Sequence, residues 1–171
     1  MSSALPYQDS ILDLFSRIQA PPNFGPATQE DIFATEKRLG GKLPERFLRW
    51  HLEADGFNGE AEVNLWRFPP LRELVSLKAL DRSVEELNIS SGNNTWRSGN
   101  PEDYVIICDQ MIYLPFYAVN IRPESLFFGE VISSAEEWLP HADLAATTFD
   151  GFADALFQSP EDVLITPAMK S

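Results

Sequence analysis

The chain has 171 residues, of which 44% are hydrophobic, so it is long enough for one domain with a full core. Its formal charge is −13: residues 1–100 carry 11 Lys/Arg against 14 Asp/Glu, and residues 101–171 carry 2 against 12. A field of this sign repels nucleic-acid phosphates and anionic membranes. It is equally compatible with a basic partner and with an acidic surface that serves only solubility.

Targeting signals and disulfides are not expected. No basic residue precedes Arg17 and no continuous apolar stretch follows the N-terminus, which argues against a signal peptide. No apolar run reaches the roughly 18 residues of a membrane helix. The single cysteine, Cys108, lies in an apolar run, so we expect a buried free thiol in a cytoplasmic protein.

The first half of the chain predicts three helices. Apolar residues recur at helical spacing over 7–19, between proline stops. Thr28 can cap a second helix by accepting a hydrogen bond from the N–H of Asp31. Its apolar stripe holds Ile32, Phe33 and Leu39.

Gly40 and Gly41 should end this helix, because glycine readily takes positive φ at a C-terminus. Leu43 and Pro44 then restart the chain. The third helix should bury one face and close at Asp55 and Gly56; that face holds Phe47, Trp50, His51 and Ala54.

The middle of the chain predicts strands and a loop. Alternation over 63–68 predicts a strand with Trp66 and Phe68 on one face. Residues 71–89 fit either a helix or a strand followed by a helix, and a mostly helical or irregular segment is favoured. Residues 90–103 are rich in Ser, Gly and Asn, so we expect an exposed loop.

Residues 104–108 form an apolar run that predicts an inner strand, and 111–119 should be its neighbour, with Asp109 and Gln110 in the turn between them. Pro115 marks a bulge or an edge. Residues 125–132 predict a further strand.

A last helix should begin near Thr147, with Asp150 in a capping box, and should end at Pro160. Its expected buried residues are Phe149, Phe152, Ala153 and Leu156. Helices followed by successive strands and a closing helix predict an α+β fold with a mainly antiparallel sheet.

The helix pair also carries a family resemblance. After the acidic cap come the motif residues Leu39, Gly40, Leu43, Pro44, Phe47, Trp50, Asp55 and Gly56. This order resembles the SUKH superfamily, in its Smi/Knr branch, although the family more often has Asn at position 55 and Leu at position 51. A second block, Phe149 and Phe152 after Thr148, stands where that family places an aromatic pair at the start of a helix.

The resemblance spans about 28–156 and implies a single SUKH-like domain over 1–171. Its parts are a leading helix and connection (1–27), a helix pair (28–57), strands and loops (58–133) and a C-terminal helical part (134–171). In that family a Gly-Asp type turn often joins two central strands, where this chain has Cys108 to Met111.

Catalytic and metal motifs are not expected. His51 lies on an apolar helix face, so a packed, hydrogen-bonded histidine is favoured over a ligand, and His141 near Asp143 matches no metal spacing. Neither histidine stands in a nucleophile motif. Adjacent carboxylates such as Glu85 and Glu86 fit a solvated face, and no glycine loop has P-loop spacing. We therefore expect no enzyme activity, metal or cofactor.

The remaining candidate is a protein interface in the acidic second half. A tryptophan with acids around it suits a partner surface, as an anchor with steering charges, and equally suits packing against the sheet. The candidate residues are Asp109, Glu130, Glu136, Glu137, Trp138 and Asp143.

The resemblance implies a non-enzymatic protein-binding domain. Bacterial members of the SUKH family are commonly immunity proteins that neutralise a cognate toxin, often a nuclease and therefore basic, which would match the acidic charge. The alternative is a regulatory or scaffold protein of the Smi/Knr type, and the third is an unrecognised hydrolase. Partner identity, oligomeric state and the binding face are left open.

Overall fold

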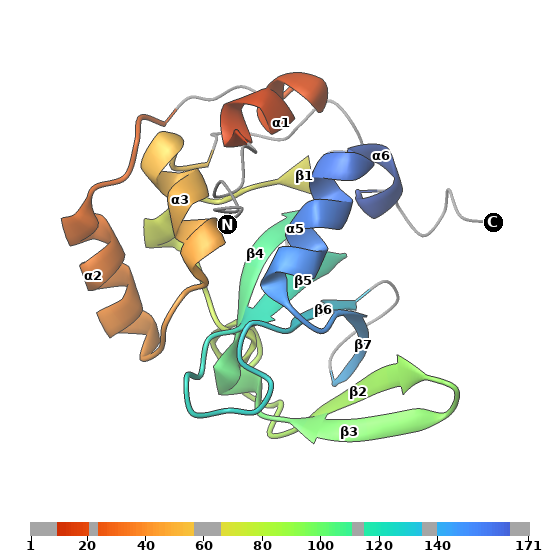
Figure 1. The fold of residues 1–171 in the computed structure, drawn as a ribbon. Helices are drawn as coiled ribbons and strands as arrows, with labels where there is room; N and C mark the ends of the chain where they lie inside the picture. The colour runs from red at the N-terminus through yellow and green to blue at the C-terminus, as the bar shows by residue number, and fades with distance from the viewer. Residues whose placement is uncertain (1–9, 21–23, 57–65, 111–114, 135–139, 165–171) are drawn as a thin grey trace, which may run out of the picture.

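The computed structural model describes residues 10–20, 24–56, 66–110, 115–134 and 140–164. These residues form one seven-stranded sheet with strand order β1-β4-β5-β6-β7-β2-β3, and helices pack on it (Figure 1). Every neighbouring pair is antiparallel except β2 and β7, which are parallel. The predicted α+β fold with a mainly antiparallel sheet is confirmed.

The elements have the following bounds. The strands are β1 Trp66–Arg67, β2 Leu87–Gly92, β3 Thr95–Gly99, β4 Tyr104–Gln110, β5 Phe116–Asn120, β6 Val131–Ser134 and β7 His141–Ala146. The α-helices are α1 Ile11–Arg17, α2 Gln29–Leu39, α3 Glu45–Glu53, α4 Leu77–Leu80, α5 Phe149–Gln158 and α6 Pro160–Val163. Two 3₁₀ turns are η1 Leu71–Glu73 and η2 Pro101–Asp103.

The caps of α2 form as the sequence predicts. The hydroxyl of Thr28 accepts a hydrogen bond from the N–H of Asp31 at 3.1 Å, and the Asp31 carboxylate accepts from the Thr28 N–H at 2.7 Å. These bonds to Thr28 lower the pKa of Asp31. Gly40 takes φ 71° at the C-cap. The expectation that Phe33 packs inward is wrong, since 67% of it is exposed and Thr35 is buried instead.

The buried face of α3 is also confirmed, because Phe47, Trp50, His51 and Ala54 are all buried. The ring of His51 packs at 4.5 Å from that of Phe47, and its Nδ1 lies 2.6 Å from Asp55 Oδ1. His51 is therefore the packed, hydrogen-bonded histidine that was predicted.

The remaining motif residues of the helix pair are buried or half-buried. Leu43 and Pro44 are buried and Leu39 is half-buried against the core. Gly56 has φ 79°, and a Cβ there would lie 2.2 Å from the Phe68 carbonyl oxygen, so only glycine fits.

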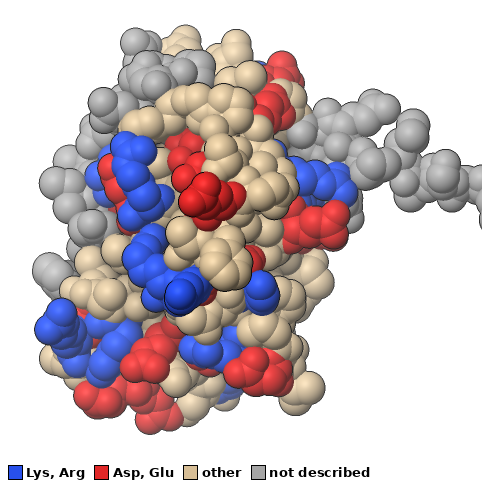
Figure 2. All heavy atoms as spheres, turned by 90° about the vertical axis from the view of Figure 1, so that its left-hand side faces the viewer, with Lys and Arg blue, Asp and Glu red and all other residues tan. Residues whose placement is uncertain are grey.

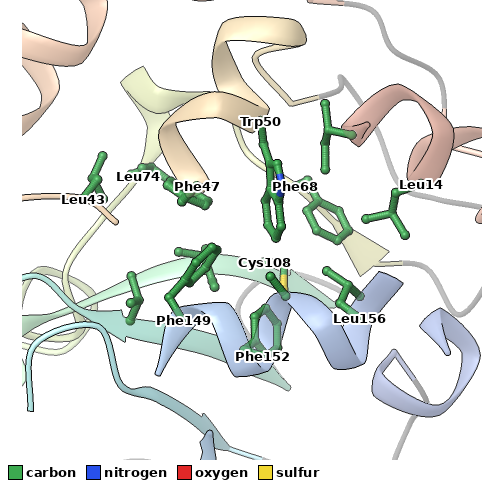
Figure 3. Packing of buried hydrophobic residues seen from close by; sticks show 14 of the residues in the cluster. Leu14, Leu43, Phe47, Trp50, Phe68, Leu74, Cys108, Phe149, Phe152 and Leu156 are labelled. Carbon is green, nitrogen blue, oxygen red and sulfur yellow. The ribbon is translucent and has the colours of Figure 1, made fainter. Parts of the chain in front are cut away.

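The main core lies between the sheet and the helices α1, α3 and α5 (Figure 3). The ring centroid of Phe149 lies 5.1 Å from that of Trp50 and 5.8 Å from that of Phe47. Phe152 lies 4.9 Å from Tyr117 of β5. These contacts join α3, α5 and the sheet into one apolar layer. Cys108 is fully buried in it, and burial raises the pKa of its thiol.

A second apolar cluster fills the other face of the sheet. It includes Leu87 and Ile89 of β2, Ile106 of β4 and Phe116 of β5, with Leu77 of α4 over them. Residues 71–86 are irregular apart from η1 and α4, as favoured, but β2 begins at Leu87 inside the segment predicted to be helical or irregular.

The loop expected over 90–103 is wrong for most of its length, because β2 and β3 form a hairpin there. Asn93 and Asn94 have φ of 50° and 57° and join the paired residues Gly92 and Thr95. Two central residues with positive φ give a turn whose twist matches antiparallel strands, and Asn tolerates that conformation. The segment is nonetheless exposed, as expected.

Two further predictions in the strand region are corrected. Asp109 and Gln110 belong to β4 and not to a turn: Asp109 pairs with Phe116, and Gln110 N–H bonds to Pro115 O at 2.9 Å. Residues 125–129 are a series of turns, and only 131–134 form the strand β6. The predicted strand at 63–68 is described only from Trp66, and Trp66 and Phe68 are both buried in the main core.

The closing helix α5 buries the four residues predicted, and it ends before Pro160, which begins α6. The capping box of Thr147 with Asp150 is wrong. The cap is Thr148, whose hydroxyl accepts a hydrogen bond from the Gly151 N–H at 3.0 Å.

Candidate functional site

Asp109 does not offer an exposed charge to a partner. It is 1% exposed and accepts two hydrogen bonds from Arg67 of β1, from Nε at 2.8 Å and from Nη2 at 2.6 Å. This bidentate pair fastens the short edge strand β1 to β4. The expectation that Asp109 lies exposed in a turn is therefore wrong.

Glu130, directly before β6, is also buried, at 4% exposure. Its Oε1 accepts hydrogen bonds from Nη2 of Arg97 on β3 and from the hydroxyl of Tyr104 on β4. The Arg97 guanidinium lies 3.6 Å from the centre of the Phe127 ring. A carboxylate held in this way ties β3 to the start of β4 and does not act as an exposed steering charge.

Asp143 is exposed on β7, where it pairs with Ser90 of β2 and Ser133 of β6. The other three candidates, Glu136, Glu137 and Trp138, lie outside the described residues, in the segment that connects β6 to β7. The structure therefore does not bring the six candidates together at one surface.

Asp143 belongs instead to an exposed face of the outer strands. Residues paired across strands point to the same side of a sheet, and the pairs Asn88–His141, Asn88–Ser98 and Ser90–Trp96 lie on the side of Asp143. We call this the β2–β3–β7 face; its residues are Asn88, Ser90, Trp96, Ser98, His141 and Asp143.

The β2–β3–β7 face is open to solvent. Trp96 is 53% exposed, and its ring stands edge-on to that of His141 with centroids 6.3 Å apart. Figure 1 shows β2 and β3 extending away from the helices that cover β4 and β5. The alternate residues Leu87, Ile89 and Ala142 point the other way and are buried. Sequence reasoning missed Trp96 because it assigned the segment to a loop.

A second exposed apolar group lies on the loop between β5 and β6. Leu126 is 97% exposed, and Phe127 and Phe128 are 39% and 41% exposed. The loop is ordered by its own hydrogen bonds, since Ser125 O accepts from the Phe128 N–H at 3.3 Å and Phe127 O accepts from the Glu130 N–H at 3.0 Å. The turn-forming residues around it could have signalled a loop here.

The metal-ligating and nucleophilic side chains of the described part of the chain are placed as follows. No three His, Cys, Asp or Glu side chains there gather as metal ligands. The thiol of Cys108 is buried with a raised pKa, which opposes formation of the nucleophilic thiolate. His141 packs on Trp96, and His51 is held by Asp55.

Residues 26–156 match the SMI1 / KNR4 family (SUKH-1). The chain belongs to this family. The match covers both motif blocks, from the cap of α2 to Leu156 of α5. No curated protein matches the chain. None of the helices described is both long enough and apolar enough to span a membrane.

Proposed function

We propose that this SUKH-family protein is an immunity protein that binds a cognate, basic toxin domain through the β2–β3–β7 face. Members of the family are often immunity proteins. The observation that carries the proposal is the open face itself, where Trp96 and His141 form an exposed aromatic pair beside the carboxylate of Asp143.

The charge of this face suits a basic partner. None of its six residues is Lys or Arg, and Arg97, which lies between them on β3, points to the other side and pairs with Glu130. The hydroxyl of Ser98 donates to the carboxylate of the exposed Glu86, which adds a second acid at the edge of the face. Acidic groups around an aromatic anchor give both attraction and a contact that buries area.

We include the segment between β6 and β7 in the proposed interface. Glu136, Glu137 and Trp138 lie three to five residues before the start of β7 in the sequence, and we assign them to the same interface. Asp109 and Glu130 are assigned structural roles instead, because their carboxylates are buried in ion pairs.

The mechanism is occlusion without turnover. A nucleic-acid enzyme must present cations to phosphates, and an acidic face placed over those cations blocks them by both volume and charge. Such binding needs no catalytic group in the immunity protein. It should weaken as salt screens the charges.

Co-expression with a toxin domain encoded beside this gene tests the proposal. The wild-type chain should restore growth, and Trp96→Ala combined with Asp143→Lys should not. The matched control is Glu45→Lys, which makes the same change of charge at an exposed position on α3. Failure of the wild-type chain to protect would refute the immunity function. Equal protection by the double variant would refute the assigned face.

A further inference from the structure

We propose a second binding site, for an acidic peptide segment that carries an aromatic or aliphatic side chain. The site is a groove of about 590 Å³ between the C-terminal half of α2 and the start of the β5–β6 loop. We call it the α2 groove. Its lining includes Phe33, Lys37, Lys42, Arg122, Pro123 and Glu124.

The walls of the α2 groove are fastened to each other. The Lys42 N–H donates to Ile121 O at 2.8 Å, and Arg122 Nη1 donates to Gly40 O at 2.8 Å. Arg122 Nε is held at 2.9 Å from Asp103 Oδ1. A Cβ at Gly41 would lie 2.5 Å from Ile121 O, so the close approach of the two walls requires glycine there. The groove therefore exists before a ligand binds.

Phe33 gives the groove an apolar contact point. Its ring is 67% exposed on a regular helix, while the neighbouring Ile32 is buried in the core. Pro123 lies on the facing wall. A large exposed aromatic side chain opposite a second apolar residue suits contact with an apolar side chain of a partner.

The charge of the groove points to an acidic partner, although the whole chain carries −13. Three cationic side chains line it, from Lys37, Lys42 and Arg122, but Arg122 is only 28% exposed and pairs with Asp103 at 2.9 Å and with Glu124 at 3.9 Å. Of the acids that line it, Glu124 has a side chain 73% exposed. The other, Glu36, is 11% exposed and engaged, since its carboxylate accepts from Lys42 Nζ and from the Leu43 N–H, both at 3.0 Å.

Lys42 keeps capacity for a ligand, because its ammonium has three donors and its side chain is 63% exposed. Figure 2 views the side of the molecule that carries α2, and shows Lys and Arg side chains interleaved with Asp and Glu side chains among other residues. Two cations of the α2 groove, Lys37 and Lys42, are exposed, against one exposed acid, Glu124. The ligand of the groove is opposite in charge to the basic toxin proposed for the β2–β3–β7 face.

Fluorescence anisotropy with a labelled eight-residue peptide tests this site in the full chain. The peptide consists of Asp and Glu with one Phe and one Leu; one comparison peptide replaces every acid with Lys, and another replaces Phe and Leu with Ser. We expect the first to bind most tightly, and Phe33→Ala and Lys37→Glu each to weaken it about tenfold. Trp96→Ala and Arg82→Glu are controls, an exposed aromatic and an exposed cation outside the groove.

All four substitutions are at exposed positions, so matched thermal unfolding will confirm that the variants fold. Absence of binding at about 1 mM peptide, a weak affinity limit, overturns the proposal. Binding of the lysine peptide as tight as that of the acidic peptide also overturns it, and so does a loss of affinity in the control variants equal to that in the groove variants. A dimer of the chain that Phe33→Ala abolishes overturns it too, because a second copy would then occupy the groove. The toxin-protection assay probes the other face, so either proposal can fail without the other.

Discussion

Replacing Glu130 with alanine separates the two roles that this residue can have. In the structure its carboxylate is buried and accepts hydrogen bonds from Arg97 and from the Tyr104 hydroxyl. If this role is structural, the substitution must destabilise the fold. If Glu130 were instead a free charge at an interface, it would change binding and leave stability alone.

The expected cost follows from what is left unpaired. Removing one member of a buried ion pair costs about 3–5 kcal/mol. The Arg97 side chain is 25% exposed and can turn toward water, which places the cost near the lower limit. Tyr104 is 1% exposed, so part of this cost is the buried acceptor that its hydroxyl loses, worth about 1–3 kcal/mol. We expect about 3 kcal/mol in total for Glu130→Ala.

Urea unfolding followed by circular dichroism measures this cost. With a slope of about 2 kcal/mol per molar urea, a loss of 3 kcal/mol lowers the midpoint by about 1.5 M. Tyr104→Phe should cost only about 1 kcal/mol, and the double variant should show coupling between the two residues. A loss below about 1 kcal/mol for Glu130→Ala would refute the buried pairing.

Three further outcomes follow from local geometry. Asp31→Asn should lower the melting temperature at neutral pH, because the bonds to Thr28 lower the pKa of Asp31 in the folded protein. A lowered pKa stabilises the fold at pH values above the ordinary pKa of 3.8. The difference in melting temperature between the variant and the wild type should therefore vanish as the pH falls through and below 3.8. Asn94→Val should lower the free energy of unfolding by about 1 kcal/mol, since Asn94 has φ 57°, whereas Asn94→Gly should be neutral in the same urea titration. Cys108 should react with a thiol reagent only after unfolding, and rapid reaction of the folded protein would contradict its burial.

The sequence predicts the helix pair well because its signals are local. The cap at Thr28 and the glycine at position 40 each act within one helical turn, and both are found as expected. The apolar face of α3 also follows from spacing alone. Phe33 is exposed although it was predicted to belong to the apolar stripe of α2, and Thr35 faces the core instead. The apolar stripe of a helix is wider than one residue, so tertiary packing decides which residues at its edges are buried.

The arrangement of the outer strands depends on contacts that sequence spacing does not encode. The parallel pairing of β2 with β7 joins residues about fifty positions apart, from Asn88 to His141. The hairpin at Asn93 and Asn94 has few apolar residues and therefore lacks the alternation by which strands are recognised. For this reason the face that carries Trp96 could not be predicted, although Asp143 on it could be singled out.

The charge segregation along the chain also changes meaning in the fold. Residues 101–171 carry a net charge of −10 in the sequence, but not all of these charges face solvent in the fold. Arginines from the first hundred residues pair with acids of the second part, so this portion of the excess holds strands and helices together. The pairs are Arg46–Asp154, Arg67–Asp109 and Arg97–Glu130. Steering of the basic partner that we propose must therefore come from exposed acids such as Asp143, and the salt dependence of that binding should reflect those acids and not the full count.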